Sequence, residues 1–491
     1  MSIPSHDSAP PPGCPAHHLG PGQLRRLYGP EAEGDPSALY DELRAEHGQV
    51  APVLVHGDLP AWLVLGHREN LDAARTPSRF SRDSRHWRAA QEGMVPPDHP
   101  LTPMTAWQPV CHFVDGSQHE RLRAAVTGSL ARFDRRGVRR YVTRFAHQLV
   151  DRFVDAGESD LVAEFAEHLP MLVMTQLMGM PEEYGPRLVQ AARDLIKGTD
   201  TAVESNDYVT AALRQLVERK QAEPGHDFAT WLIEHESALS TDEVTEHLRL
   251  VLIAAYETTA NLIVNTLLMV LTDRRFRASL SGGHMTLPDA LEQVLWDAPP
   301  LSTVLGRWAT GDTTLGGQQI KTGDLLLLGL AAGNTDPEIR PDLSQPVHGN
   351  RSHLAFSSGP HECPGQDIGR AIADTGIDVL LARLPDLGLG VNETELVWDS
   401  SLMSRHLRFL PVRFTPAQDR RGKPAASAPA PEPSTPAPAP AAQADRTART
   451  PQQPTSSVPL PPPNPAAGPA PEQPDRRKEQ RPLWLRLFGG K

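Results

Sequence analysis

The feature that most constrains the fold is a long segment, residues 240–273, that contains neither glycine nor proline. Ser240 and Glu243 have the spacing of a capping box, and Leu239 and Val244 have the spacing of a hydrophobic staple, so a helix is expected to begin here. A helix of about 30 residues is about 45 Å long, enough to cross a large domain. We therefore expect one long helix through the middle of a large domain.

The centre of this helix mixes polar with apolar residues. Glu257 and Thr258 lie in a mainly apolar run. Threonine is a weak helix former and an unpaired buried carboxylate is costly, so the two residues indicate either a function or a partly exposed helix with a solvated glutamate. Residues 250–271 are long enough to span a bilayer, but a carboxylate is expensive in lipid. We expect a buried core helix and no transmembrane segment.

The rest of the body is expected to be mostly helical. Leu122, Val126 and Leu130 share one helical face after a turn at residues 115–117. Helical spacing recurs at residues 119–130, 141–153 and 161–177, and strand-like runs are few, at residues 61–65, 313–320 and 325–328, the last two as a hairpin region. The pattern predicts a mainly α fold with small β-sheets.

Composition divides the chain into four parts. Residues 24–415 form the globular body, whereas residues 1–23 and the Pro/Ala-rich residues 416–475 cannot bury enough apolar surface to order themselves. Residues 476–491 combine a basic cluster with an aromatic and aliphatic segment. This end is either unstructured or a docking element for a signalling partner or an anionic membrane surface.

Charge and cysteine content exclude several classes of protein. The formal net charge of −12 argues against a nucleic-acid binder. Three cysteines, Cys14, Cys111 and Cys363, provide neither a disulfide framework nor a zinc motif. The N-terminus lacks the pattern of a signal peptide, so we expect a cytoplasmic protein, with a peripheral membrane contact only through its tail.

The segment around Cys363 carries the strongest chemical signal. Cys363 lies in a loop rich in glycine and proline that leads into a helix beginning near Gln366. Backbone N–H groups at a helix N-terminus favour a thiolate, and Gly359 and Gly365 allow the backbone to approach a flat partner closely. The alternative is a buried structural cysteine, which is the usual role of a lone cysteine.

Residues 356–370, with Phe356, Gly359, His361, Cys363 and Gly365, resemble the cysteine-ligand loop of the cytochrome P-450 superfamily, in its bacterial, actinobacterial form. The resemblance implies the cytochrome P-450 fold and haem b, with Cys363 as the axial iron ligand. It also implies that Phe356 packs beside the sulfur and that His361 meets a haem propionate. Thiolate ligation favours cleavage of the O–O bond.

Other segments share this resemblance. His119 and Arg123 match the family's pair of propionate contacts, and a spacing of four residues places both on one helical face. Arg307 matches a further arginine that binds a propionate. Glu257 and Thr258 match the acid–alcohol pair that delivers protons during dioxygen activation. Where the family usually has a glycine just before this pair, the nearest small residue here is Ala255.

One family motif is altered. Gln293 and Trp296 stand where the family has the glutamate and arginine of Glu-x-x-Arg, and Gln345 takes the place of a loop arginine. Losing one member of a buried ion network is strongly destabilising, whereas replacing the whole set can be neutral, so we expect a substituted core. The Gln-x-x-Trp variant resembles a subset of actinobacterial members often encoded beside small-GTPase signalling operons.

Two functions follow from the resemblance. The first is a monooxygenase that inserts one oxygen atom from O2 into a small organic substrate, with electrons from a ferredoxin and a ferredoxin reductase because no reductase domain is fused. The second is a haem-binding sensor or signalling component with little turnover. Glu257 and Thr258 favour the first, whereas Ala255, Gln293, Trp296 and the tail favour the second. The sequence does not identify the substrate.

Overall fold

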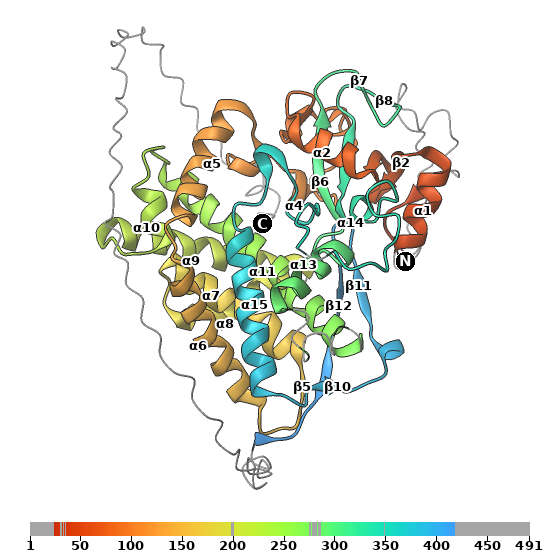
Figure 1. Ribbon diagram of the computed structural model, residues 1–491. Helices are drawn as coiled ribbons and strands as arrows, with labels where there is room; N and C mark the ends of the chain where they lie inside the picture. Colours follow the sequence, from red (N-terminus) through yellow and green to blue (C-terminus); the bar gives the residue numbers. More distant parts are fainter. Residues whose placement is uncertain are drawn as a thin grey trace, which may run out of the picture. The chain divides into compact units, whose positions relative to one another are not determined.

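The computed structural model describes residues 24–29, 32, 34, 36–197, 201–273, 276, 282, 286–347 and 349–417, which belong to one compact unit (Figure 1). The predictions made for residues 1–23 and for residues 476–491 lie outside this part, as do those for residues 418–475. Within the described part, helices dominate and the sheets are small, which confirms the predicted fold class.

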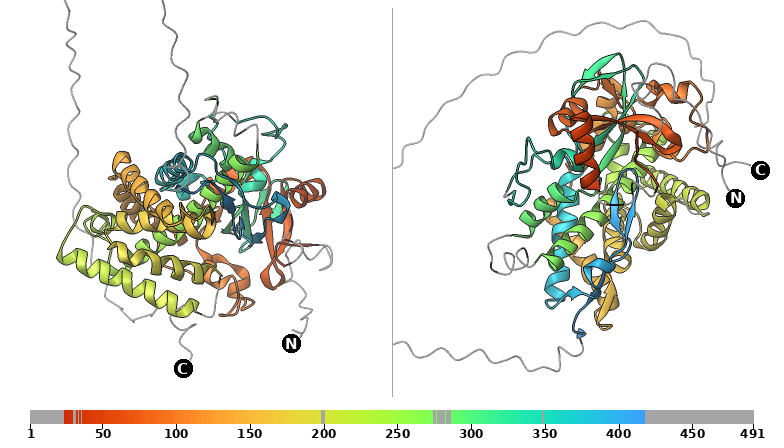
Figure 2. Two further views of the ribbon diagram at one scale, coloured as in Figure 1. Left: turned by 90° about the horizontal axis from the view of Figure 1, so that it is seen from below. Right: turned by 90° about the vertical axis from the view of Figure 1, so that its right-hand side faces the viewer.

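The helices α5 to α11 and α15 form the larger side of the unit, and α1 and α2 lie beside the main sheet (Figures 1 and 2). Their bounds are α1 Pro36–His47, α2 His67–Arg75, α3 Arg88–Gln91, α4 Thr102–Thr105, α5 Gly116–Leu130, α6 Arg135–Phe153, α7 His168–Met178, α8 Gly185–Lys197, α9 Ala202–Ala222, α10 Phe228–Ile233, α11 Thr241–Thr272, α13 Leu287–Asp297, α14 Leu330–Asn334 and α15 Gln366–Arg383. The helix α11 packs against α7, α9, α13 and α15 and is the centre of this arrangement.

The main sheet has six strands in the order β1-β2-β3-β9-β6-β4. These are β1 Arg25–Arg26, β2 Val50–Val55, β3 Leu59–Val64, β9 Leu325–Gly329, β6 Thr303–Ala309 and β4 Phe80–Ser81. The smaller sheets are β10 Gly388–Leu389 with β13 Pro411–Arg413 and β5 Glu158–Asp160, β11 Trp398–Ser400 with β12 Arg405–Leu407, and β7 Thr313–Leu315 with β8 Gln318–Ile320. The described strands thus join segments far apart in the sequence.

The structure confirms the long central helix. Ser240 caps α11, its side chain accepting the N–H of Glu243 at 3.2 Å, while the Glu243 carboxylate accepts the N–H of Ser240 at 2.9 Å. Among the described helices, α11 alone is long and apolar enough to cross a membrane, but 61% of its most apolar stretch is buried inside the protein. That burial is typical of a core helix.

Three local predictions differ from the structure. Residues 115–117 do not form a separate turn, because Asp115 is the N-cap of α5 and the helix begins at Gly116. Residues 161–177 are divided between a π-helix at Val162–Ala166 and α7. Residues 325–328 belong to β9, which pairs with β3 and β6 in the main sheet and is not a partner in the β7–β8 hairpin.

Candidate cofactor-binding and catalytic site

Cys363 lies between the short 3-10 helix η8 (Gly359–His361) and the first turn of α15, as the sequence predicts. Its N–H donates to the carbonyl of Phe356 at 2.9 Å, which closes the loop. Burial raises the pKa of the Cys363 thiol, whereas a hydrogen bond from the Gly365 N–H and the charge of Arg123 lower it. The thiol therefore lies among groups that favour a thiolate once a metal ion also stabilises the negative charge.

The two loop glycines serve different purposes. Gly359 has a φ of +73°, and a Cβ there would lie 2.7 Å from the carbonyl oxygen of Ala74 in α2. Its need for glycine thus comes from packing against α2, not from the flat partner that the sequence analysis invoked. Gly365 faces open space within 4 Å, which leaves room for such a partner. Two residues before Gly359, Ser357 adopts a left-handed φ of 58°.

The predicted propionate contacts lie together. The rings of His119 and His361 have centroids 4.2 Å apart, and the His361 Nε2 lies 2.8 Å from an Asp115 oxygen. Arg123, one turn beyond His119 on α5, donates to the carbonyl of Glu362. Arg307 on β6 is 2% exposed, and its one hydrogen bond within the described part is a long one, 3.3 Å, to the carbonyl of Gly306.

Sequence reasoning missed one member of this cluster, Arg82, which follows β4. Arg82 is 2% exposed, and its guanidinium donates to the carbonyls of Leu305 and Gly306, both at 2.7 Å. It also donates to the carbonyl of His112 at 3.1 Å. Because these acceptors lie up to 224 residues away in the chain, no local pattern could have identified Arg82.

The cluster is short of negative charge. Asp115 is the carboxylate that it contains; burial opposes ionisation, but hydrogen bonds from His361, Ser81 and the Arg82 N–H lower the pKa of Asp115 to about 2. Burial, together with the nearby guanidinium groups, lowers the pKa of His361 to about 3, and burial lowers that of Arg307 to about 10. Buried positive charge in such excess is unfavourable unless an anion joins it.

Unpartnered atoms in the cluster show what kind of anion fits. The Nε2 of His119 is buried and has no hydrogen-bond partner in the part of the chain that the structure describes. The buried Arg307 guanidinium likewise has N–H groups without an acceptor in the described part. Two carboxylates arriving together would satisfy both groups, and haem b carries two propionates. The donors present and the open space at Gly365 therefore fit haem b.

On α11 the predicted acid–alcohol pair lies at an open stretch of an otherwise largely buried helix. Ala254 is exposed and Ala255, Glu257 and Thr258 are half-buried, whereas most positions after them are buried. The Glu257 carboxylate accepts the Ser404 hydroxyl at 3.2 Å, and the Thr258 hydroxyl donates to the Ala254 carbonyl at 2.6 Å. A Cβ on Gly369, in the first turn of α15, would lie 3.8 Å from the Thr259 hydroxyl oxygen, so this stretch of α11 lies beside the turn that follows the Cys363 loop.

The altered motif on α13 forms a polar and aromatic contact set. Gln293 accepts the Val347 N–H at 3.0 Å and donates to Asp297 at 2.6 Å. The indole N–H of Trp296 donates to the Asn350 carbonyl at 2.8 Å. Arg340 lies over the Trp296 ring at 5.3 Å and pairs with Asp297 at 2.8 Å.

Two expectations about this region need correction. Gln345 is exposed and bonds to Asp342, so the structure does not bring it to Gln293 or Trp296. The core is also not free of charges, because Glu292, one residue before Gln293, is 3% exposed and ionised. The prediction that the charged network is simply replaced overlooked this residue, since an isolated glutamate beside the motif gives no signal of burial.

Glu292 is the centre of a second buried cluster. It accepts from Arg370 at 2.7 and 3.3 Å and lies 3.1 Å from the His353 Nε2. Burial would raise the pKa of Glu292, but these hydrogen bonds lower it to about 2. Arg370 also lies over the ring of Phe356 at 4.4 Å. Phe356 is thus held from the side of α15, next to the Cys363 loop; its packing beside the sulfur stays a prediction.

Comparisons with known proteins show which family the chain is similar to. No family model matches the chain. It is 30% identical to 6-deoxyerythronolide B hydroxylase of Saccharopolyspora erythraea over 76% of this chain and 95% of that protein. It is also 30% identical to the cytochrome P450 monooxygenase PikC of Streptomyces venezuelae over 81% and 94%.

Among solved structures, CYP154A1 from Streptomyces coelicolor A3(2) matches with a TM-score of 0.68 and 30% identity, covering 78% of this chain and 98% of that one. The testosterone-bound CYP154C4 from Streptomyces sp. ATCC 11861 matches with a TM-score of 0.71 and 29% identity, covering 77% and 96%. With the Cys363 loop, the cation cluster fitted to haem b and relatives of this similarity, the chain belongs to the bacterial cytochrome P450 family and is a haem-dependent monooxygenase.

Proposed function

We propose that this cytochrome P450 inserts one atom of O2 into a small organic substrate, with electrons from a ferredoxin and its reductase. The observation that carries the proposal is the coincidence, in one region, of a cysteine at the start of α15, a buried cation cluster short of anions, and an acid–alcohol pair on the open stretch of α11. Bound haem b supplies the chemistry of dioxygen activation.

The residues have separate roles in this proposal. Cys363 ligates the iron, and the Gly365 N–H moderates the charge of its sulfur. His119, Arg123, Arg307 and His361 bind the propionates. The rings of His119 and His361 lie against each other and Arg307 is buried, so the surrounding protein restricts these side chains. Little ordering is then needed on binding.

Glu257 and Thr258 supply and move protons. Glu257 lines a small cavity of about 40 Å³ together with Tyr256, Arg193 and His406, so its carboxylate lies among polar groups from other elements. Ser404 holds the carboxylate in place, and Thr258 shares the open stretch of α11. A carboxylate and a hydroxyl on adjacent residues can pass a proton into a site that is otherwise apolar.

The reduced, carbon-monoxide-bound absorption spectrum tests the cofactor site. Wild-type protein is expected to show a strongly red-shifted Soret band, and Cys363→Ser is expected to lose it, because a hydroxyl does not replace a thiolate. A spectrum that is the same in both proteins contradicts ligation by Cys363.

The sensor or signalling role is the second candidate, favoured by Gln293 and Trp296 and by Ala255. Dioxygen consumption with a ferredoxin, its reductase and NADPH separates the two. A monooxygenase is expected to consume dioxygen faster when a substrate displaces the distal water and changes the spin state, and Thr258→Ala is expected to divert the electrons to peroxide. A haem protein that binds carbon monoxide but consumes no dioxygen with any substrate contradicts the first candidate.

A further inference from the structure

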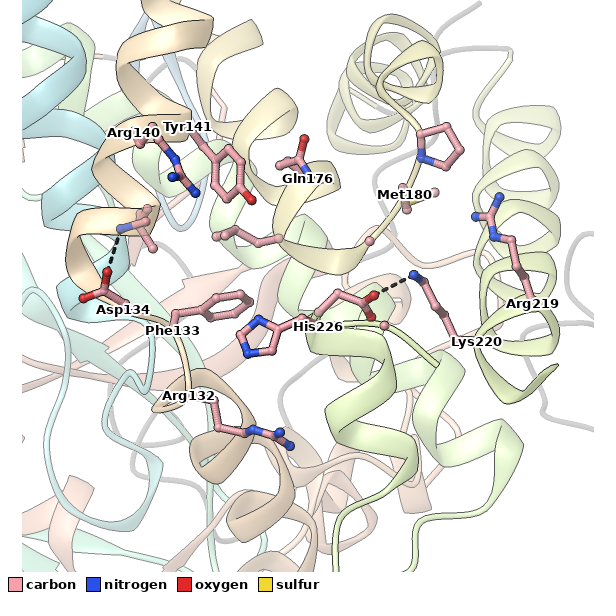
Figure 3. Close-up of a pocket in the computed structure, with 17 residues that line it drawn as sticks. Arg132, Phe133, Asp134, Arg140, Tyr141, Gln176, Met180, Arg219, Lys220 and His226 are labelled. Atoms are coloured by element: carbon pink, nitrogen blue, oxygen red, sulfur yellow. Dashed lines mark hydrogen bonds and ion pairs between the residues drawn. The ribbon is translucent and has the colours of Figure 1, made fainter. Parts of the chain in front are cut away.

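Two cavities in the described part differ in how their walls are hydrogen-bonded. The larger, of about 670 Å³, lies between the ends of α6, α7, α9 and α10, and Figure 3 shows its basic side chains on different sides of it. None of its lining residues has a buried side-chain nitrogen or oxygen without a partner in the described part. The smaller, of about 40 Å³, lies beside Glu257, and two of its lining residues have such an atom. The smaller cavity is therefore the one whose walls require a further hydrogen-bonding group.

The two unpartnered atoms are the Nδ2 of Asn261 on α11 and the Nδ1 of His406 on β12. Asn261 follows Glu257 by one helical turn, so both lie on the same face of α11. His406 follows Ser404 by two residues in an extended segment, so both side chains point to the same face of the hairpin. Because the Ser404 hydroxyl donates to the Glu257 carboxylate at 3.2 Å, that face is turned towards α11.

The size of the cavity suits water and excludes a larger ligand. A water molecule needs about 10 to 15 Å³ of such space and two to four polar partners, so a volume of about 40 Å³ holds about one to three waters. A buried polar atom without a partner is costly, and waters that bond to Asn261 and His406 remove that cost. The walls thus fit a short chain of waters that ends at Glu257.

Most charged groups on the walls are already paired. Glu167 pairs with Arg193, which also hydrogen-bonds to the Tyr256 hydroxyl. Asp399 pairs with Arg408 at 2.5 Å, and the Arg408 side chain is 56% exposed, so this pair lies where the cavity meets the surface. Burial raises the pKa of Tyr256, and a guanidinium does not release its proton in a protein. Neither the tyrosine nor the arginines can therefore pass protons near neutral pH.

Among the lining residues, His406 is the one with a side chain that ordinarily gains and loses a proton near neutral pH. Its Nδ1 is buried, whereas the residue as a whole is only half-buried, so the ring reaches from the cavity towards the surface. Its cross-strand neighbour on β11 is Asp399 of the surface pair. An imidazole has a nitrogen on each side of its ring, which allows it to accept a proton on one side and donate one on the other.

We propose that His406 relays protons from solvent to Glu257 through water held in this cavity, with the Asn261 amide fixing that water. The relay rests on the proposed function, in which Glu257 supplies protons. A proton from solvent binds the ring, the Nδ1–H passes to a cavity water, and that water passes a proton to the Glu257 carboxylate. The ring gains one proton and loses one, so its charge is restored. His406 acts through Glu257 and touches no reacting atom.

The first test is structural. A crystal structure of the haem-loaded protein is expected to show ordered water within hydrogen-bond distance of the His406 Nδ1 and, directly or through a second water, of the Glu257 carboxylate. Asn261→Leu, which replaces the amide with an apolar side chain of similar size, is expected to lose this water. A wild-type cavity without ordered water between His406 and Glu257 overturns the relay.

The second test measures proton delivery in the haem-loaded protein with a ferredoxin, its reductase and NADPH. The readouts are the fraction of consumed dioxygen that is released as hydrogen peroxide and the solvent isotope effect, from rates in H2O and D2O. In His406→Gln, which keeps a polar side chain that cannot relay a proton, we expect a larger peroxide fraction and a larger isotope effect. Water formation is expected to fall roughly tenfold, below the range of about 10²- to 10⁴-fold for direct acid–base groups, because other waters still reach Glu257. Asn261→Leu is expected to change both readouts in the same direction.

Arg405→Gln is the matched control, because Arg405 precedes His406 on β12 but does not line the cavity. It is expected to behave like wild type, and the reduced carbon-monoxide spectrum of every variant is expected to match wild type. A wild-type peroxide fraction and isotope effect in His406→Gln, or the same change in Arg405→Gln, overturns the relay and leaves the monooxygenase intact. A wild-type protein that consumes no dioxygen overturns both the relay and the proposed function.

Discussion

Two buried charged clusters lie on either side of the Cys363 loop, and they differ in balance. Around Glu292, one carboxylate meets Arg370 and His353 with hydrogen bonds of 2.7 to 3.3 Å, so the groups satisfy one another. Around Arg307 and His361, in the part that the structure describes, guanidinium groups outnumber the Asp115 carboxylate, and the Nε2 of His119 has no hydrogen-bond partner. The difference teaches that a balanced cluster holds the fold together, whereas an unbalanced one is completed by a ligand.

The balanced cluster predicts the largest effect. Glu292→Gln leaves Arg370 and His353 without their counter-charge, and we expect the free energy of unfolding to fall by about 3 to 5 kcal/mol. Urea denaturation measures it. The double variant Glu292→Gln/Arg370→Gln is expected to recover part of the loss, because the uncompensated charge is gone. If the double variant loses the sum of the two single effects, the pair does not act as a unit.

For the unbalanced cluster, we expect a substitution to weaken haem binding rather than to destabilise the fold. Arg307→Met removes a propionate partner, so we expect haem binding to weaken by about 1.5 to 3 kcal/mol, as measured by transfer of haem to apomyoglobin. Without haem the same variant is expected to be no less stable than wild type, because a buried unpaired charge is removed. Haem affinity equal to that of wild type would show that the cluster is structural.

The pH dependence sharpens the comparison. In haem-free protein His361 stays neutral down to about pH 3, whereas in the unfolded chain it gains a proton near pH 6.5. The unfolded state therefore binds more protons in this window, so stability falls as pH decreases from 6.5 towards 3. We expect His361→Asn to reduce the slope between pH 6 and 4 by about 1.4 kcal/mol per pH unit. Glu292 and Asp115, whose pKa is lowered to about 2, lose their contributions as pH falls from their ordinary pKa values of 4.5 and 3.8 towards 2, so they add to the slope mainly below pH 4.5. An unchanged slope would mean that another group carries the effect.

The smallest effect is expected in the loop between the clusters. Ser357 adopts a left-handed φ of 58°, which disfavours a residue with a Cβ, and its buried hydroxyl lacks a hydrogen-bond partner in the described part. We expect Ser357→Gly to raise the free energy of unfolding by about 0.5 to 1 kcal/mol, after the greater entropy of glycine in the unfolded chain is subtracted. Ser352→Gly, in the segment before the loop, is a control without positive φ. A loss of stability in Ser357→Gly would show that the serine contributes more than its backbone costs.

Local patterns predicted much of the fold and part of the site. The capping box of α11, the helix that follows Cys363 and the pairing of His119 with Arg123 on one face all depend on residues within a few positions of one another. Arg82 and the partners of Glu292 could not be predicted in this way. Their contacts join residues 30 to 224 positions apart, and the chain offers no periodic signal at that distance. The same reason explains why β9 was placed in a hairpin, since its true partners lie in other parts of the sequence.

The two glycines of the cysteine loop record different evolutionary pressures. Gly359 is required by its contact with α2, so a descendant of this protein that had stopped using haem would still be selected to keep it. Gly365 faces open space, and its small size matters only while something occupies that space. Among divergent homologues, substitution at Gly365 with retention of Gly359 would therefore mark lineages that keep the fold but no longer bind haem.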